Sequence, residues 1–405
     1  GDLVTAESWS QITVNESFAN YSEYLWDEYK YGKDKADEHN FDDMEGYLFS
    51  ESENKDLVRF YYSNKEDVFD AVSYNKGGRI LNMLRNYVGD DAFFKSLNYY
   101  LTTNKFKAGE AGLLRLAFEE VTGKDMNWFW NQWYYGSGHP VLDISYNYDM
   151  PGVARVIVEQ KQKSDKVWRL PIAIDVYNGA SKKRSNVWIE NKIDTFYFAY
   201  TQKPDLINVD ADKILLAEKK DNKTEANYIA QWNYAKTYMD RKEALDAFAK
   251  KGMPEIAKGL KDRFSGLRLS TIQQIGTTPY KADPVVLETM EEIAKTEKDN
   301  RTRAAAIKYL AKTKNAKYLP IFQANVADSS YSVAGASLEG LTALDSANAY
   351  TLAKKYSTDA KGALGNAVNN TLIAAGSEAD FDFIAKNYDN APPSFDKVKM
   401  TTQFG

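Results

Sequence analysis

The sequence changes character at one stretch, Trp133-Tyr134-Tyr135-Gly136-Ser137-Gly138-His139-Pro140. Before it, apolar residues recur every three or four positions, which is the spacing of one face of a helix. After it, apolar and polar residues alternate, which is typical of strands buried on one side. Two glycines and a proline favour a turn here. We therefore expect a domain boundary near residue 138.

The part before the boundary, residues 1–138, carries three helical patterns. They cover 18–29, 80–88 and 113–121, and the last two end at a glycine, which is a common helix stop. The stretch from Asp34 to Asp70 is acidic and less periodic. It predicts a long excursion with short helices only.

The part after the boundary, residues 139–219, predicts strands. Short runs with period two occur at 153–158, 170–176, 187–189 and 195–200, and they are separated by Gly, Asn, Ser and Lys. Short strands without intervening helices favour a small antiparallel β-sandwich.

The last part, residues 220–405, is helical again and contains an internal echo. Segments that begin at Asp299, Asp328 and Asp359 resemble one another, at offsets of 29 and 31 residues. Such offsets fit a HEAT-like repeat of helix pairs that bury their apolar faces by stacking. An ordinary helical bundle is the alternative. The chain as a whole is expected to be a multidomain α+β protein with domains 1–138, 139–219 and 220–405.

Composition excludes several classes of protein and site. The 405 residues include no cysteine, which excludes disulfides, thiolate zinc sites and cysteine nucleophiles. With 52 basic and 57 acidic residues the net charge is −5, so no basic footprint for a nucleic acid is expected. No apolar run approaches 18 residues, so no membrane span is expected.

The histidines are the next constraint, because the sequence has two of them, His39 and His139. A metal site made of histidines alone is therefore impossible. We expect His39 to lie on a solvated acidic surface and His139 to serve interdomain packing or capping.

The first helix carries an acidic stripe. Glu16, Asn20, Glu23 and Asp27 fall at i, i+4, i+7 and i+11, so they share one face. Such a stripe is commonly solvated. A carboxylate on it could also bind a metal while a neighbour orients another ligand. The residues by themselves leave both interpretations open.

A second candidate element is Ser73-Tyr74-Asn75-Lys76-Gly77-Gly78, at the start of a helix. Ser73 is a candidate N-cap, and the glycines allow close approach of another backbone. The Tyr74 hydroxyl could donate a hydrogen bond into a cleft, or the ring could simply pack at the helix start. The acidic residues just before it, Glu66, Asp67 and Asp70, fit a solvated run better than a site for a substrate amine.

In order along the chain, these motifs resemble those of the aminopeptidase N-like zinc metallopeptidases, the gluzincin aminopeptidases. Gly1-Asp2-Leu3-Val4-Thr5 and Asn15-Glu16-Ser17-Phe18-Ala19 are similar to the family's G-[ND]-L-V-T and N-E-[GS]-F-A motifs. Tyr74-Asn75-Lys76-Gly77 is similar to Y-x-K-G, and residues 133–140 resemble the W-x-x-x-x-G-x-P end of the catalytic domain.

The resemblance implies roles for three residues. Glu16 corresponds to the third zinc ligand, Glu23 to a glutamate that holds a zinc-bound histidine, and Tyr74 to the donor that stabilises the tetrahedral intermediate. It also implies the helical remainder of a thermolysin-like catalytic domain, followed by the β-sandwich and the helical repeats. Zn²⁺ would be the cofactor and peptides the substrates.

The sequence also departs from the family pattern, since neither H-E-x-x-H nor the amine-binding G-x-M-E-N loop occurs. Three protein ligands are usual for catalytic zinc. We therefore expect a C-terminal portion of a zinc aminopeptidase, beginning just after the metal helix, with zinc weakly bound or absent and no activity by itself. The alternative is a non-catalytic peptide- or protein-binding scaffold. Arg301 or Arg303 could recognise a substrate carboxylate, and nothing in the sequence separates them.

Overall fold

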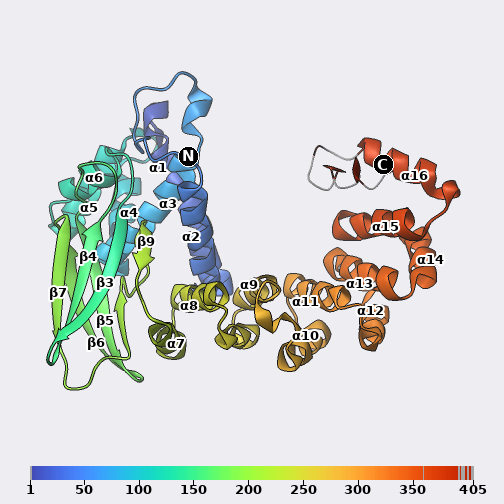
Figure 1. The fold of residues 1–405 in the computed structure, drawn as a ribbon. Helices are drawn as coiled ribbons and strands as arrows, with labels where there is room; N and C mark the ends of the chain where they lie inside the picture. The colour runs from blue at the N-terminus through green and yellow to red at the C-terminus, as the bar shows by residue number, and fades with distance from the viewer. Residues whose placement is uncertain (1, 359, 391–392, 394–396, 399–400, 403–405) are drawn as a thin grey trace. The chain divides into compact units, whose positions relative to one another are not determined.

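The structure is a computed structural model, and it describes all residues except 1, 359, 391–392, 394–396, 399–400 and 403–405 (Figure 1). It consists of two compact units, residues 1–244 and residues 245–405. Helices occupy most of unit 2 and a large part of unit 1, and the larger sheets lie within residues 141–221. This is the multidomain α+β class that the sequence predicts, whereas the domain boundaries at 138 and 219 stay predictions.

Unit 1 begins with a helical layer. Its helices α1 to α6 span Thr13–Tyr31, Lys33–Leu48, Gly77–Val88, Asp90–Thr103, Ala111–Thr122 and Asn127–Trp133. Helix α1 packs against α2 and α3, and α4 packs against α5. A short parallel pair, β1 (Thr5–Ala6) and β2 (Ala108–Gly109), joins the segment before α1 to the segment between α4 and α5.

Helix α2 corrects one expectation, because part of the stretch predicted to hold short helices is a continuous helix of 16 residues. Its buried face runs through Ala36, Asn40, Asp43, Met44 and Tyr47. Two of these five residues are polar. The apolar residues of this face therefore do not recur at the regular helical spacing from which a helix is predicted in a sequence.

The strands of unit 1 form two larger sheets. One has the order β7-β4-β3-β9 and the other β6-β5-β8. Strands β3 to β9 span Val141–Met150, Val153–Gln160, Leu170–Asn178, Ser181–Ile189, Ile193–Ala199, Leu206–Val209 and Glu218–Asp221. Both sheets contribute to a single hydrophobic cluster, for example through Val156 and Ile174. The pair β3–β9 is parallel and departs from the antiparallel pattern, because the long 210–217 segment brings the chain back before β9 begins.

Polar contacts fix the helical layer to the sheets. Arg79 of α3 is buried, and its guanidinium donates to the backbone carbonyls of Lys213 (2.8 Å) and Leu215 (3.1 Å). Lys166, between β4 and β5, donates to the carbonyls of Gln132 (2.9 Å) and Ser137 (3.2 Å) and so caps the C-terminal end of α6. The helices and the sheets therefore form one body.

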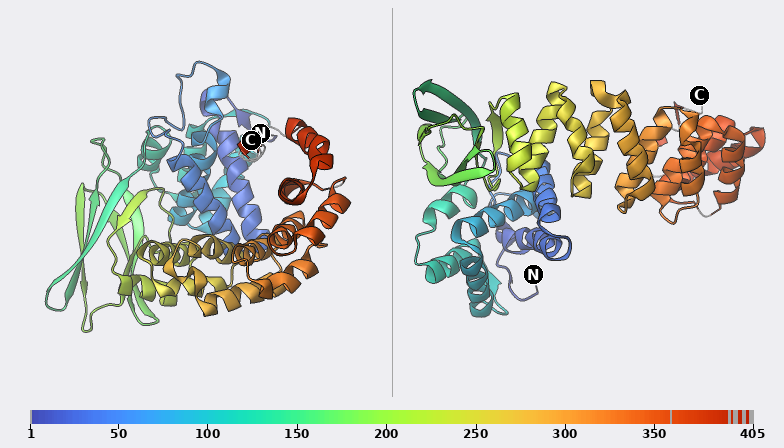
Figure 2. Two further views of the ribbon diagram at one scale, coloured as in Figure 1. Left: turned by 45° about the vertical axis from the view of Figure 1, so that its right-hand side comes forward. Right: turned by 90° about the horizontal axis from the view of Figure 1, so that it is seen from below.

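Two helices complete this region, α7 (Glu225–Tyr234) and α8 (Tyr238–Lys251). In unit 2, helices α9 to α16 span Ser265–Ile275, Pro284–Thr296, Asn300–Lys312, Leu319–Asn325, Tyr331–Leu344, Ser346–Tyr356, Gly362–Ala375 and Phe381–Asn390. Helices α9, α11, α13 and α15 contact one another in succession, with α10, α12 and α14 beside them (Figures 1 and 2).

The stacked helices explain the echo in the sequence. Helices α11 and α13 begin at Asn300 and Tyr331, within the segments that begin at Asp299 and Asp328. The Asp299 carboxylate accepts the Thr302 N–H and caps α11. The third echo starts at Asp359, which lies outside the described residues, and α15 follows it. The repeated pattern is therefore confirmed as a stack of helix pairs.

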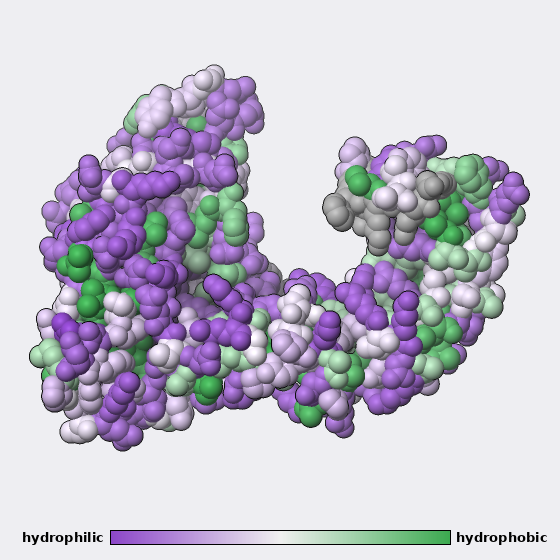
Figure 3. Space-filling model, in the orientation of Figure 1, coloured by the Kyte–Doolittle hydropathy of each residue, from purple (hydrophilic) through white to green (hydrophobic). Residues whose placement is uncertain are grey.

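Hydrophilic residues dominate the face of the molecule in Figure 3, with smaller hydrophobic patches between them. Across the described part of the chain, no helix combines the length and the apolar character that a membrane crossing would need.

Candidate functional site

The candidate site depends on an unusually close approach of α1 and α3. A Cβ atom added at Gly77 would lie 1.8 Å from Ser17 Oγ, and one added at Gly78 would lie 1.8 Å from Asn20 Oδ1. The Ser17 hydroxyl uses this proximity to donate to the Ser73 carbonyl at 2.7 Å. The two glycines therefore do what the sequence suggested, and the approaching partner is helix α1.

A π-helical turn, Val72–Lys76, leads into α3 and carries Tyr74. It is closed by the Lys76 N–H, which donates to the Ala71 carbonyl at 2.9 Å. Turns of this kind are rare in proteins overall, and those that occur are frequently found at functional sites. Ser73 is not the N-cap that the sequence suggested, because it is buried inside the turn and its hydroxyl donates to the Val68 carbonyl.

The structure brings Glu16 and Tyr74 together. Both side chains are half-buried, and the Glu16 carboxylate lies close enough to the Tyr74 hydroxyl to influence its protonation. Partial burial and this contact with a carboxylate raise the pKa of Tyr74 to about 12. The phenol is consequently a protonated hydrogen-bond donor at neutral pH.

Asp43 of α2 supports this arrangement, and the sequence analysis missed it. Its Oδ1 accepts hydrogen bonds from Asn20 Nδ2 (3.0 Å) and Asn75 Nδ2 (2.9 Å), so it ties together α1, α2 and the π-turn. Burial raises the pKa of its carboxyl group. A signal was present in the sequence, since Asp43 lies one turn after His39 and three residues after Asn40 on a helix whose buried side is partly polar.

Glu23 lies on the exposed side of α1, with a side chain that is 70% exposed. Its nearest ionic neighbour is His39, at 3.8 Å, and His39 also lies 3.2 Å from Asp27 and 3.5 Å from Asp43. Glu23, Trp26, Asp27 and His39 line a hollow of about 390 Å³. His39 is therefore half-buried among carboxylates and not on a solvated surface.

His139 lies where packing was expected. Its Nδ1 is 3.3 Å from the Tyr47 hydroxyl and its Nε2 is 3.0 Å from Glu218, so it links α2 to β9.

The acidic residues before Tyr74 divide into two kinds. Glu66 and Asp67 are exposed, as expected of a solvated run. Asp70 is half-buried and paired with Lys55 and Arg59, both at 2.9 Å. Burial would raise the pKa of Asp70, but these hydrogen bonds lower it below its ordinary value.

A metal centre needs more ligands than this chain brings together. Across the described residues, no group of three or more His, Cys, Asp or Glu side chains could hold a metal ion. Glu16 therefore offers one carboxylate, and these residues do not fit a complete three-ligand zinc site. In unit 2, the Arg303 guanidinium is paired with Asp328 at 2.7 Å, and Arg301 is exposed.

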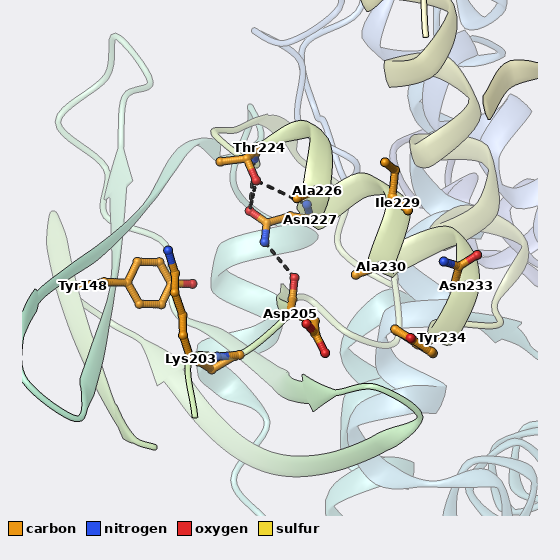
Figure 4. A pocket seen from close by; sticks show the side chains of 11 residues that line it. Tyr148, Lys203, Asp205, Thr224, Ala226, Asn227, Ile229, Ala230, Asn233 and Tyr234 are labelled. Atoms are coloured by element: carbon orange, nitrogen blue, oxygen red, sulfur yellow. Dashed lines mark hydrogen bonds between the residues drawn. The ribbon is translucent and has the colours of Figure 1, made fainter. Parts of the chain in front are cut away.

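A second hollow, of about 430 Å³, lies in unit 1 beside α7 (Figure 4). Its polar groups are engaged with one another. Lys203 Nζ lies 4.3 Å from the centre of the Tyr148 ring, and Asn227 Nδ2 donates to the Asp205 carbonyl at 2.8 Å. No candidate site residue lines it.

Comparison with known structures defines the class of fold. The crystal structure of Legionella pneumophila aminopeptidase A in complex with aspartic acid matches all of this chain and 54% of its own, with a TM-score of 0.67 and 12% sequence identity. The chain therefore shares the fold of the matching part of that structure, and the HEAT repeats model matches residues 253–342.

The sequence comparison gives the family. Residues 1–133 match the Peptidase family M1 domain, and this match together with the relatives below supports an M1 aminopeptidase-like family for the chain. It is 26% identical over 232 residues to thyrotropin-releasing hormone-degrading ectoenzyme of Rattus norvegicus, covering 50% of this chain and 21% of that protein. It is 28% identical over 210 residues to aminopeptidase N of Lactococcus lactis subsp. lactis, covering 47% and 23%. The aligned part thus spans about a fifth to a quarter of the length of these relatives.

Proposed function

We propose that this chain forms part of a zinc-dependent aminopeptidase that removes N-terminal residues from peptides. The observation that carries the proposal is the contact between Tyr74 and Glu16, which are brought together from two helices by the paired glycines of α3. The match of residues 1–133 to the Peptidase family M1 domain and the similarity to aminopeptidase N support the class of reaction.

Each candidate residue has a role in this proposal. Glu16 would supply one carboxylate to a zinc ion, which would need its remaining ligands from residues other than 1–405. Bound zinc with an open position polarises a carbonyl and activates water. Tyr74 keeps its proton at neutral pH and donates it as a hydrogen bond toward the charge that develops on the substrate oxygen. Glu23, exposed on the same helix, would hold one of the histidine ligands of that zinc ion, as the resemblance implies.

The chain by itself is expected to be inactive, because one carboxylate does not hold catalytic zinc. The assay is hydrolysis of a chromogenic alanyl or leucyl substrate with added zinc. We expect turnover no higher than that of Glu16→Ala. Turnover clearly above this variant would contradict the expectation of inactivity.

The proposed reaction is tested with a protein that joins this chain to the residues that precede Gly1 in its gene. Glu16→Ala should lose bound zinc, measured by metal analysis. Tyr74→Phe should keep zinc and lose about 10²–10³-fold in kcat. Tyr61→Phe is the matched control, since this hydroxyl is exposed and donates to Asp56. Full activity of Tyr74→Phe would refute the role of the phenol.

A second candidate function is a non-catalytic scaffold, which the stacked HEAT-like helices of unit 2 favour. A scaffold would bind peptides without cleaving them. In the protein just described, peptide binding with no zinc and no hydrolysis would support it.

A further inference from the structure

Lys76 is a buried charged residue that the proposed reaction does not use. Its side chain is 0% exposed, although it lies two residues after Tyr74 and its backbone closes the π-turn. Among the described residues, Nζ of Lys76 has no hydrogen-bond acceptor. A buried ammonium group without a partner is strongly disfavoured, because it loses its hydration and gains nothing in return.

The Lys76 amine lies over the face of the Tyr47 ring, whose centre is 5.5 Å from Nζ, and this cation–π contact is weakly favourable. The charged groups that act on Lys76 are Lys166, Asp56, Arg59 and Asp70.

The carboxylates among these groups are engaged elsewhere. Asp70 accepts hydrogen bonds from Lys55 and Arg59, and Asp56 accepts one from Tyr61. Lys166, a cation, is held by two backbone carbonyls and repels a charge on Lys76. The surroundings therefore disfavour a proton on Lys76 and offer no ready counter-ion.

The position of Lys76 connects this cost to the site. A π-turn contains one residue more than the α-helical turn to which it relaxes. If the extra residue leaves the turn and the turn becomes α-helical, the preceding side chains rotate by about 100° around the helix axis. Such a rotation would carry the Tyr74 phenol away from Glu16. Whatever loosens the packing of Lys76 thus acts directly on Tyr74.

We propose that Lys76 is a positioning residue for Tyr74, and that proton uptake at its buried amine weakens the π-turn that holds the phenol against Glu16. The proposal rests on the proposed function only for the role of the Tyr74 hydroxyl as a hydrogen-bond donor in the reaction. The position of the turn itself can be measured without any peptidase activity.

The direction and the range of the pH effect follow from burial. Burial lowers the pKa of Lys76 from the ordinary value of 10.5 to about 7, and the charge of Lys166 adds to this. When the turn opens to water, the amine binds a proton more readily than in the closed turn. Opening therefore becomes more favourable as the pH falls from 10.5 to 7, and the effect levels off below 7.

The test is hydrogen exchange of the backbone amides of residues 72–76 in the 405-residue chain, corrected for the intrinsic effect of pH. With these pKa values, the opening equilibrium should be about tenfold more favourable at pH 6 than at pH 8. Lys76→Met, of similar length and without charge, should remove this pH dependence. Lys65→Met is the matched control, because Lys65 is exposed and lies on the segment before the turn.

Two results would overturn the proposal. One is equal corrected protection at pH 6 and pH 8 in the wild-type chain, a measurement that needs no variant to fold. The other is an unchanged pH dependence in Lys76→Met. Neither result depends on zinc or on hydrolysis, so failure of this proposal is distinguishable from failure of the proposed function.

Discussion

Replacement of Gly77 by alanine should destabilise unit 1 by forcing α1 and α3 apart. The new Cβ would lie 1.8 Å from Ser17 Oγ and 2.5 Å from Ser17 Cβ, far inside the 3.4 Å at which ordinary contact begins. Overpacking of this kind costs about 1–3 kcal/mol. Displacing Ser17 from the Ser73 carbonyl adds about 1 kcal/mol. Alanine recovers about 1 kcal/mol through its better helix propensity. The net loss in the free energy of unfolding is therefore about 1–3 kcal/mol.

The assay is urea unfolding followed by tryptophan fluorescence, with Gly112→Ala as the control. Gly112 lies in helix α5, and its nearest neighbour is the flexible Glu110 carboxylate at 3.1 Å, so alanine there should be neutral or stabilising. Combining Gly77→Ala with Ser17→Gly removes the clashing side chain and should restore at least half of the loss. If Gly77→Ala behaves like Gly112→Ala, or if the two substitutions simply add, the close-approach argument is refuted.

Three further variants test how the site is held in place, each by urea unfolding. Asp43→Ala leaves two half-buried amide donors without their shared acceptor and should cost about 1–3 kcal/mol. A loss below about 0.5 kcal/mol, roughly the error of the method, would show that this carboxylate is not a bridge. Arg79→Met leaves two buried carbonyls without a donor and should cost about 2–4 kcal/mol, and an unchanged denaturant midpoint would contradict that. Gly136→Ala would place a Cβ 2.7 Å from Lys166 Nζ and should cost about 1–3 kcal/mol. Adding Lys166→Met should return part of the last loss, and a fully additive double variant would argue against the clash.

The sequence was most informative about the candidate site where the absence of a side chain, or a short motif, restricts what can lie next to a residue. The paired glycines of Gly77 and Gly78 implied a close approach before the partner was known, and the N-E-S-F-A and Y-N-K-G motifs singled out Glu16 and Tyr74. The helix pairs of unit 2 could be predicted from their repeated starts, because similar segments recur in the sequence at nearly constant spacing.

The features that the sequence did not predict depend on contacts between distant segments. Helix α2 was missed because Asn40 and Asp43 occupy core-facing positions, where an apolar period was expected. The π-turn around Ser73 looked like a simple helix start, because its extra residue is accommodated by packing and not by any local pattern. The parallel pairing of β9 results from the long return of the chain before it. The alternation of residues within a strand carries no information about that return.

The cap that Lys166 places on α6 has a practical consequence for dividing this protein. A cut at residue 138 would separate α6 from the amine that satisfies its last carbonyls, and would separate the Arg79 side chain from both of its acceptors. The helical piece so produced would expose apolar surface that the sheets now cover, and it would be expected to aggregate. The smallest portion that preserves the surroundings of Tyr74 is therefore unit 1 extended to the end of α8, residues 1–251, and any effort to graft or express the candidate site should begin from that length.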